Sequence, residues 1–263
     1  SSEKKYIIEA SIDDENPYVG EQVTLLFRFA TTADIHIRNA GYELPDLSDF
    51  WTEGIESRRK YSKVIDGKTF QVTELAIPIF PIRTGDVTVG PILVQYEELQ
   101  PSGNQPRSPF FHDPFSGSMF DDNFFKMFRG DNIVKRTART APISLHVSPL
   151  PTKDKPEAFS GGVGKFSLTA RLSEDEIKAG ESVTLTLALS GEGNIRDVAD
   201  PSVEVESVKI YSDHPSVNVK NYHDKVVGEK MYKLALVPQQ AGQITIPEIT
   251  VPYFNPESER FEV

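Results

Sequence analysis

The sequence predicts an all-β protein built from two tandem immunoglobulin-like antiparallel β-sandwich domains. Apolar and polar residues alternate with a period of two along short segments, and Gly- or Pro-containing turns separate these segments. The first half of the chain recurs in the second half, and no long segment has a helical period. A length of 263 residues also suits two domains of about 100–150 residues each.

The internal repeat appears at two shifts. A shift of 160 residues aligns 6–25 with 166–185, including the Val-Gly-Glu and Ala-Gly-Glu turns. A shift of 157 aligns 75–96 with 232–253, including one Pro and one Gly in each copy. A single change in loop length accounts for the difference between the two shifts. Both halves are therefore expected to have the same strand order.

Alternating residues predict the strands themselves. Residues 23–30 and 183–190 place Val, Leu or Phe at every second position, as expected for strands with one buried face. In the same way 143–147 predicts a terminal strand for the first unit. Six to eight such strands in about 90 residues are typical of an immunoglobulin-like sandwich.

The repeat divides the chain into three parts. Residues 1–149 form the first sandwich, 150–165 a linker rich in Pro, Gly and charge, and 166–263 the second sandwich. Only ten residues follow Tyr253, whereas the first unit continues much further after the matching Tyr96. We therefore expect the second sandwich to lack its last strand, which would lie partly or wholly beyond Val263.

Composition excludes several classes of function. The chain has no Cys, so it has no disulfide or thiolate chemistry. A formal net charge of −11 opposes binding to nucleic acid or to an anionic membrane surface. The five His lack the spacing of a helical zinc pair, and Gly161–Lys165 fails as a phosphate loop because Phe166 follows. No nucleophile–base pair can be placed, so neither an enzyme nor a cofactor is predicted.

An insertion at about 100–136 interrupts the first unit. It holds seven of the 16 Phe and two of the three Met, and a short amphipathic helix is predicted within it. Either these side chains cover an edge of their own sandwich, or they form a partner-binding hook. The candidate partner-binding residues are Phe120, Phe124, Phe125, Met127 and Phe128.

Three smaller features each allow two interpretations. The acidic turns 13–15 and 174–176 are either solvated turns or contacts for a metal or a partner, and the first interpretation is favoured. Trp51 is either a core or edge residue of the sandwich, which is favoured, or a platform for stacking a glycan.

Several sequence blocks, in their order along the chain, resemble a known family. They are Ala10-Ser11-Ile12, Asn16-Pro17-Tyr18-Val19-Gly20-Glu21-Gln22-Val23-Thr24-Leu25, Pro45-Asp46-Leu47 with Phe50-Trp51, Pro149-Leu150-Pro151, Phe159-Ser160-Gly161 with Val163-Gly164-Lys165-Phe166, and Ala241-Gly242-Gln243-Ile244-Thr245-Ile246-Pro247 with Tyr253-Phe254-Asn255-Pro256. With the linker and the insertion, these blocks resemble the BatD family of bacterial envelope proteins, also called oxygen-tolerance or aerotolerance proteins.

The resemblance implies a non-enzymatic role. Members of this family are periplasmic proteins that are anchored in the membrane, here through segments outside this chain, and are linked to oxygen tolerance or envelope stress. They are encoded with MoxR-type ATPases and von Willebrand factor A domain proteins, which are the partners the resemblance implies. The expected function is thus an interaction scaffold. The alternative is a carbohydrate-binding or adhesion module of the cell surface.

Overall fold

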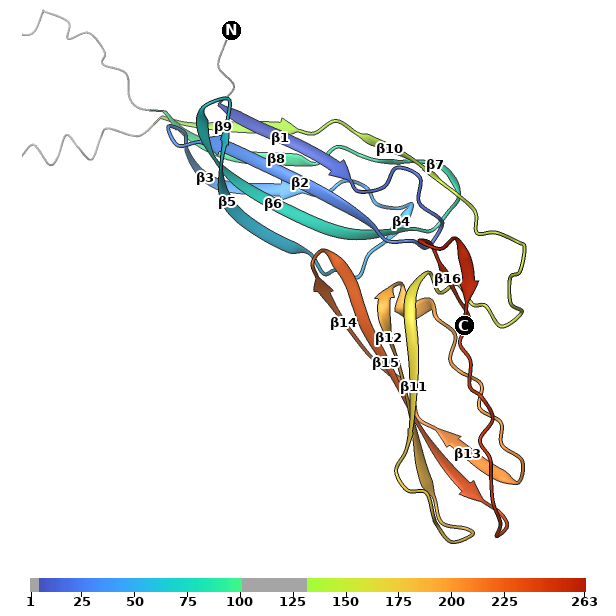
Figure 1. Cartoon of the computed structure of the whole chain (residues 1–263). Coiled ribbons are helices and arrows are strands. Elements are labelled where there is room, and N and C mark those ends of the chain that lie inside the picture. Colours follow the sequence, from blue (N-terminus) through green and yellow to red (C-terminus); the bar gives the residue numbers. More distant parts are fainter. Residues whose placement is uncertain (1–4, 101–131) are drawn as a thin grey trace, which may run out of the picture.

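The computed structural model describes residues 5–100 and 132–263, and this part of the chain is all-β, which confirms the predicted fold class (Figure 1). Its one helical element is a 3-10 turn, η1 (Ile195–Asp197). No helix in the described ranges is long and apolar enough to span a bilayer. The five candidate residues of the insertion, and the short helix predicted there, lie outside the described residues.

In the described residues, the first sandwich contains ten strands in two layers. They are β1 (Tyr6–Ile12), β2 (Val23–Thr32), β3 (His36–Glu43), β4 (Phe50–Trp51), β5 (Ser57–Ile65), β6 (Lys68–Pro81), β7 (Gly85–Val89), β8 (Leu93–Gln100), β9 (Asn132–Arg139) and β10 (Ile143–Val147). One layer has the order β1-β2-β6-β4, with β5 also paired to β6. The other layer consists of β3-β8-β9 and the pair β10-β7.

Apolar residues at alternate strand positions form the core of the first sandwich. Val23, Leu25, Phe27 and Phe29 of β2 all point inward, as their spacing predicts, and meet buried residues of β7, β8 and β10. The remaining large members of this cluster are Phe50, Leu75, Ile77, Ile79, Val87, Val89, Ile92, Val94, Tyr96, Leu145 and Val147.

The predicted insertion ends earlier than the sequence indicated. Residues 132–136 belong to β9, where Asn132 pairs with Gln100 and Arg136 pairs with Tyr96 of β8. The sequence placed the end of the insertion at about 136, and β9 begins within the last part of that stretch. The polar and basic residues of β9 hide the alternation, because β9 lies at the edge of its sheet and exposes most of its side chains.

The second sandwich repeats the first layer strand for strand. Its strands are β11 (Gly164–Leu172), β12 (Val183–Gly193), β13 (Val208–Ser212), β14 (Ser216–Tyr222), β15 (Lys225–Pro238), β16 (Tyr253–Asn255) and β17 (Arg260–Glu262). The order is β11-β12-β15-β13, with β14 paired to β15. The register repeats as well, because Ile12 opposite Leu25 recurs as Leu172 opposite Leu185.

The second layer of this sandwich differs from the prediction. Among the described residues, 240–252 form no paired strand, although 244–246 align with β7 of the first unit. A strand needs a neighbour that satisfies its backbone groups, and in the described residues β16 pairs with β17 and bridges to Val163 but does not pair with 240–252. The linker is also shorter than predicted, because β11 begins at Gly164, inside the 150–165 stretch.

Candidate functional site

The acidic turn 13–15 acts as a local cap, whereas at the equivalent place of the second sandwich the Thr184 N–H donates to the Ser173 hydroxyl at 3.1 Å. The carboxylate of Asp13 accepts a hydrogen bond from the Thr24 N–H at 2.7 Å, and that of Asp14 accepts one from the Asn16 N–H at 2.8 Å. Side-chain caps of this kind are common at turns. In the described ranges, no group of three or more His, Asp or Glu side chains is arranged to hold a metal ion.

Trp51 lies at the edge strand β4 and packs on its own sandwich. Its ring is half-buried and contacts the Phe80 ring with centroids 5.2 Å apart and planes inclined by 50°. Phe80 is buried. This contact favours the interpretation of Trp51 as an edge residue of the sandwich over a glycan platform.

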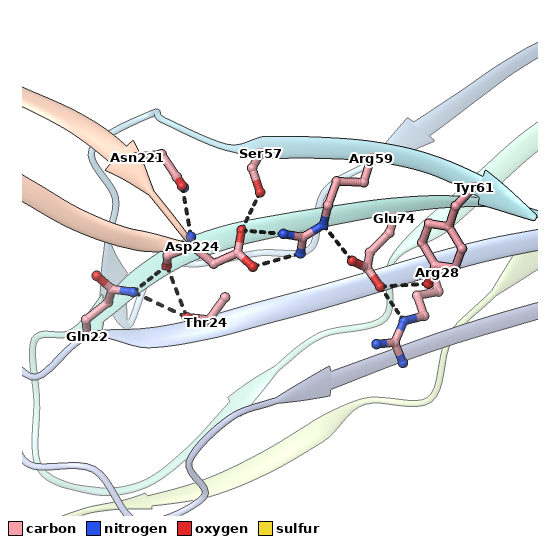
Figure 2. Close-up of polar contacts among 9 residues, drawn as sticks. All are labelled: Gln22, Thr24, Arg28, Ser57, Arg59, Tyr61, Glu74, Asn221 and Asp224. Atoms are coloured by element: carbon pink, nitrogen blue, oxygen red, sulfur yellow. Dashed lines mark hydrogen bonds and ion pairs between the residues drawn. The ribbon is translucent and has the colours of Figure 1, made fainter.

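The candidate site lies instead at the junction between the two sandwiches, which is shown in Figure 2. At this junction the β14–β15 hairpin of the second sandwich meets β2 and β5 of the first. The tip of the hairpin is the pair His223-Asp224, whose φ angles of 50° and 65° make a type I′ turn. The turn therefore presents Asp224 to the first sandwich.

Asp224 makes contacts with both its side chain and its backbone. The Arg59 guanidinium donates to both carboxylate oxygens, at 2.7 and 3.2 Å, and the Ser57 hydroxyl donates to one of them. The Gln22 amide donates to the Asp224 carbonyl at 2.8 Å. The Gln22 side-chain oxygen in turn accepts from the Val226 N–H at 2.7 Å. One hairpin tip thus bonds to side chains of β5 and to Gln22, just before β2, in the other sandwich.

Arg59 connects this contact to a buried carboxylate. Glu74 of β6 is only 8% exposed at its side chain and accepts hydrogen bonds from Arg59 at 2.8 Å and from Arg28 at 2.6 Å. The Tyr61 hydroxyl donates to it at 3.0 Å. Figure 2 shows these side chains as one continuous row from Asp224 to Arg28. These hydrogen bonds hold the Arg59 guanidinium in position to pair with Asp224.

The pKa values of both carboxyl groups reflect these partners. Burial tends to raise the pKa of Glu74, but hydrogen bonds from Arg28, Tyr61 and Arg59 outweigh burial and bring the pKa below its ordinary value. Burial likewise tends to raise the pKa of Asp224, and hydrogen bonds from Arg59 and Ser57 lower it overall. Both groups are therefore ionised at neutral pH.

Apolar contacts add to the junction. The Tyr18 ring meets the Phe254 ring edge-on with centroids 4.9 Å apart. Gly20 lies so close to Val163 and Asn194 that an added Cβ would be 3.2 Å from each. The two sandwiches thus contact each other through aromatic rings and backbone as well as through ion pairs.

A second ion pair joins the two sandwiches. Arg196 of η1 pairs with Glu53 at 2.7 Å, and the Glu53 side chain is 6% exposed. This pair involves neither the hairpin tip nor β5, so it holds the sandwiches together independently of Asp224. Two separate anchors restrict rotation between the sandwiches more than one anchor does.

Asp224 is not among the candidate residues predicted from the sequence, although one signal for it exists. The repeat aligns His223-Asp224 with Asp66-Gly67, which is the type I′ turn of the β5–β6 hairpin. Gly is the usual second residue of such a turn, and a non-Gly residue with positive φ costs about 1 kcal/mol. A departure from local preference at a repeated turn often marks a contact that compensates for the strain.

Replacing Asp224 by Asn is expected to loosen the junction. Asn tolerates the left-handed backbone, but it removes the charge that pairs with Arg59, which costs about 2 kcal/mol. Because the chain has no native Cys, spin labels at Lys63→Cys and Lys209→Cys report the distance between the sandwiches cleanly. We expect a narrow distance distribution for the parent and a broad one for Asp224→Asn. Asp213→Asn, an exposed position in the same sandwich, is the control and leaves the distribution unchanged.

The contribution of Asp224 to the free energy of unfolding also depends on pH in a defined direction. Its pKa in the folded protein lies below the ordinary value of 3.8, so its contribution is complete above that value and disappears as the pH falls towards the lowered one. The free energy of unfolding of the parent and of Asp224→Asn can be measured from pH 7 to pH 2. The difference between the two proteins should be constant above about pH 5 and vanish at the acid end. A difference that grows on acidification would contradict this assignment. Glu21 and Asp197, whose pKa values burial raises, are common to both proteins and cancel in the comparison.

Comparisons with known proteins address the second sandwich directly. Residues 170–263 match the family model described as BatD DUF11 like domain. No curated protein matches the chain. Among solved structures, the chain is similar to the type II cohesin dyad from the adaptor ScaA scaffoldin of Acetivibrio cellulolyticus, at 10% sequence identity and a TM-score of 0.20, with 91% of this chain and 87% of that chain covered. This score is too low to support an argument.

The matched residues extend from the last part of β11 through β17. They include the hairpin tip that carries Asp224 and the β16–β17 hairpin that carries Phe254. The second sandwich is therefore similar to the BatD DUF11-like domain, and the resemblance to the BatD family predicted from the sequence is confirmed over these residues.

Proposed function

We propose that this chain is a non-enzymatic interaction scaffold of the bacterial cell envelope. It acts on the periplasmic side as part of a membrane-anchored protein linked to oxygen tolerance or envelope stress. Its partners are von Willebrand factor A domain proteins of a MoxR-linked system. The match of residues 170–263 to the BatD domain supports this proposal.

The observation that carries the proposal is the junction. A scaffold must hold its docking surfaces at a fixed separation, because ordering two loosely linked domains on binding reduces affinity. Here Asp224 with Arg59, and Arg196 with Glu53, tie the sandwiches at two separate points. The row of charges serves this positioning and needs no catalytic role to explain the lowered pKa values.

The test is a binding assay with the purified chain and the ectodomain of a von Willebrand factor A protein encoded beside it. We expect saturable one-to-one binding by the parent. We also expect weaker binding by Asp224→Asn, mainly through faster dissociation, because its two surfaces are no longer held in register. Asp213→Asn is the matched control. Absence of binding by the folded parent would refute the proposed partner class.

A second variant separates the insertion from the junction. Because Gln100 pairs with Asn132, residues 101–131 can be replaced by Asn-Gly, which closes β8 and β9 as a two-residue hairpin. If Phe120, Phe124, Phe125, Met127 and Phe128 form a partner-binding hook, this variant loses binding while its unfolding temperature is retained. If it binds like the parent, docking belongs to the two sandwiches themselves.

A further inference from the structure

The first sandwich is closed by β10, which has a neighbour on each side. On one side it pairs antiparallel with β7, with Ile143 opposite Val89 and Val147 opposite Gly85. Leu145 and Val147 point into the core and are buried. The strand therefore covers apolar core residues and satisfies the backbone of β7 at the same time.

On its other side, β10 lies along the segment 15–19. The His146 N–H donates to the Glu15 carbonyl at 2.8 Å. The Ser148 N–H donates to the Pro17 carbonyl, also at 2.8 Å. The position of β10 is thus a slot with two walls, namely β7 and the segment before the Gly-Glu turn.

The second sandwich has the same framework around this slot. The Gly20 N–H donates to the Pro81 carbonyl at 2.9 Å, and the equivalent Gly180 N–H donates to the Pro238 carbonyl at 2.9 Å. These two bonds join the Gly-Glu turn to the end of the long central strand in each sandwich. The two walls of the slot therefore begin at equivalent positions in the first and the second sandwich.

In the second sandwich the slot is an open groove of about 840 Å³. One wall is 174–179 and the other is formed by residues of 242–246. The floor includes Leu172, Val183 and Leu236, which are apolar. Within the described residues, no strand pairs with 242–246.

The open groove leaves an apolar side chain in solvent. Ile244 is 37% exposed, whereas the equivalent Val87 of β7 is 2% exposed because β10 lies beside it. Exposure of one Ile is ordinary by itself, but here it lies on the wall of an apolar groove. What covers this position in the first sandwich is a strand with apolar residues at every second position.

The register shows where such a strand would come from. In the first sandwich Tyr96 pairs with Arg136, and Val89, seven residues earlier, pairs with Ile143, seven residues later. In the second sandwich Tyr253 pairs with Glu262, and Ile246 lies seven residues before Tyr253. The same register places the partner of Ile246 seven residues after Glu262. Val263 already lines one cavity with residues of 248–251, on the way to the groove.

We propose that this groove is a strand-acceptor site. Its occupant is an extended segment with apolar residues at alternate positions, which continues the direction of β17. The segment runs antiparallel to 242–246 and parallel to 175–179, as β10 does in the first sandwich. This inference is independent of the proposed partners, because it follows from the repeat and from the open slot alone.

The test adds a strand in the predicted register. A copy of residues 138–149 is fused directly after Val263, which places the copy of Ile143 opposite Ile246 and the copy of Leu145 opposite Ile244. We expect backbone amides within 242–246 to exchange hydrogen at least tenfold more slowly than in the parent chain, and the unfolding temperature of the second sandwich to rise.

Three controls make the result specific. A fusion in which the copies of Ile143, Leu145 and Val147 are Ser has the same length, and a fusion that starts at Arg139 shifts the register by one residue and turns the apolar face outward. Neither should protect 242–246. Ile244→Glu should leave the parent chain folded, since this side chain is already exposed, and should abolish protection in the fusion.

Two results would overturn the proposal. Equal exchange in the matched fusion and the Ser fusion would mean that the groove does not select a strand with alternating apolar residues. Protection by a free peptide of residues 138–149, but not by the fusion, would mean that the groove takes its strand from another molecule rather than in continuation of β17. Neither result depends on binding of a von Willebrand factor A protein.

Discussion

Glu74→Ala is expected to lower the free energy of unfolding by about 3 kcal/mol, because it leaves two guanidinium groups and a hydroxyl without their buried acceptor. The estimate lies at the low end for a broken buried pair, since Arg28 and Arg59 are 35% and 44% exposed and can be hydrated. Chemical denaturation measures the change. The spin-label distance between the sandwiches should broaden as well, because Arg59 loses the group that orients it towards Asp224.

Glu9→Ala is the matched control for this prediction. Glu9 pairs with the same Arg28 at 3.3 Å, but its side chain is 55% exposed, so its loss should cost less than about 0.5 kcal/mol. Glu74→Gln, which retains one acceptor oxygen, should be intermediate. If Glu74→Ala were as stable as Glu9→Ala, water would have replaced the buried carboxylate at no cost and the row of charges would not hold Arg59.

Gly193→Ala is expected to destabilise the second sandwich by about 4 kcal/mol through steric overlap and backbone strain. Its φ is +123°, and an added Cβ would lie 2.2 Å from the Val163 carbonyl oxygen and 2.9 Å from Gly164 Cα. Both contacts are with backbone, so no side-chain rotation relieves them. The close approach of β11 and β12 at this end therefore requires Gly.

Two spectroscopic probes separate the sandwiches in this experiment. Trp51, the single Trp, lies in the first sandwich, so its fluorescence reports unfolding of that part. Circular dichroism reports both parts. For Gly193→Ala we expect an earlier circular dichroism transition while the Trp51 transition moves less. Gly180→Ala, with φ of +89° and no atom within 4 Å of its Cβ, should cost only about 1 kcal/mol.

Periodicity was sufficient to predict most strands. Val23, Leu25, Phe27 and Phe29 are buried on one face of β2, as their spacing requires, because successive side chains of a strand point to opposite sides. The repeat predicted that both halves share a strand order, and the register of β1 with β2 recurs in β11 with β12. These are local properties of the chain.

Periodicity also led to one strand that is not formed. Residues 244–246 carry the alternation of β7, yet they pair with no strand in the described part of the chain. Alternation records which side chains would face a core, whereas a strand also requires a neighbour for its backbone. The predicted loss of the last strand beyond Val263 stays a prediction, and the fusion experiment above tests its physical basis.

The junction could not be read from the sequence. Asp224 and Arg59 are 165 residues apart, and their contact depends on how one sandwich is placed against the other. Alternation fixes the face of each strand because it reflects burial within a single sheet. It contains no information about which exposed carboxylate meets which exposed guanidinium across two domains. That pairing was decided only by the tertiary structure, where shape and opposite charge bring the hairpin tip to β5.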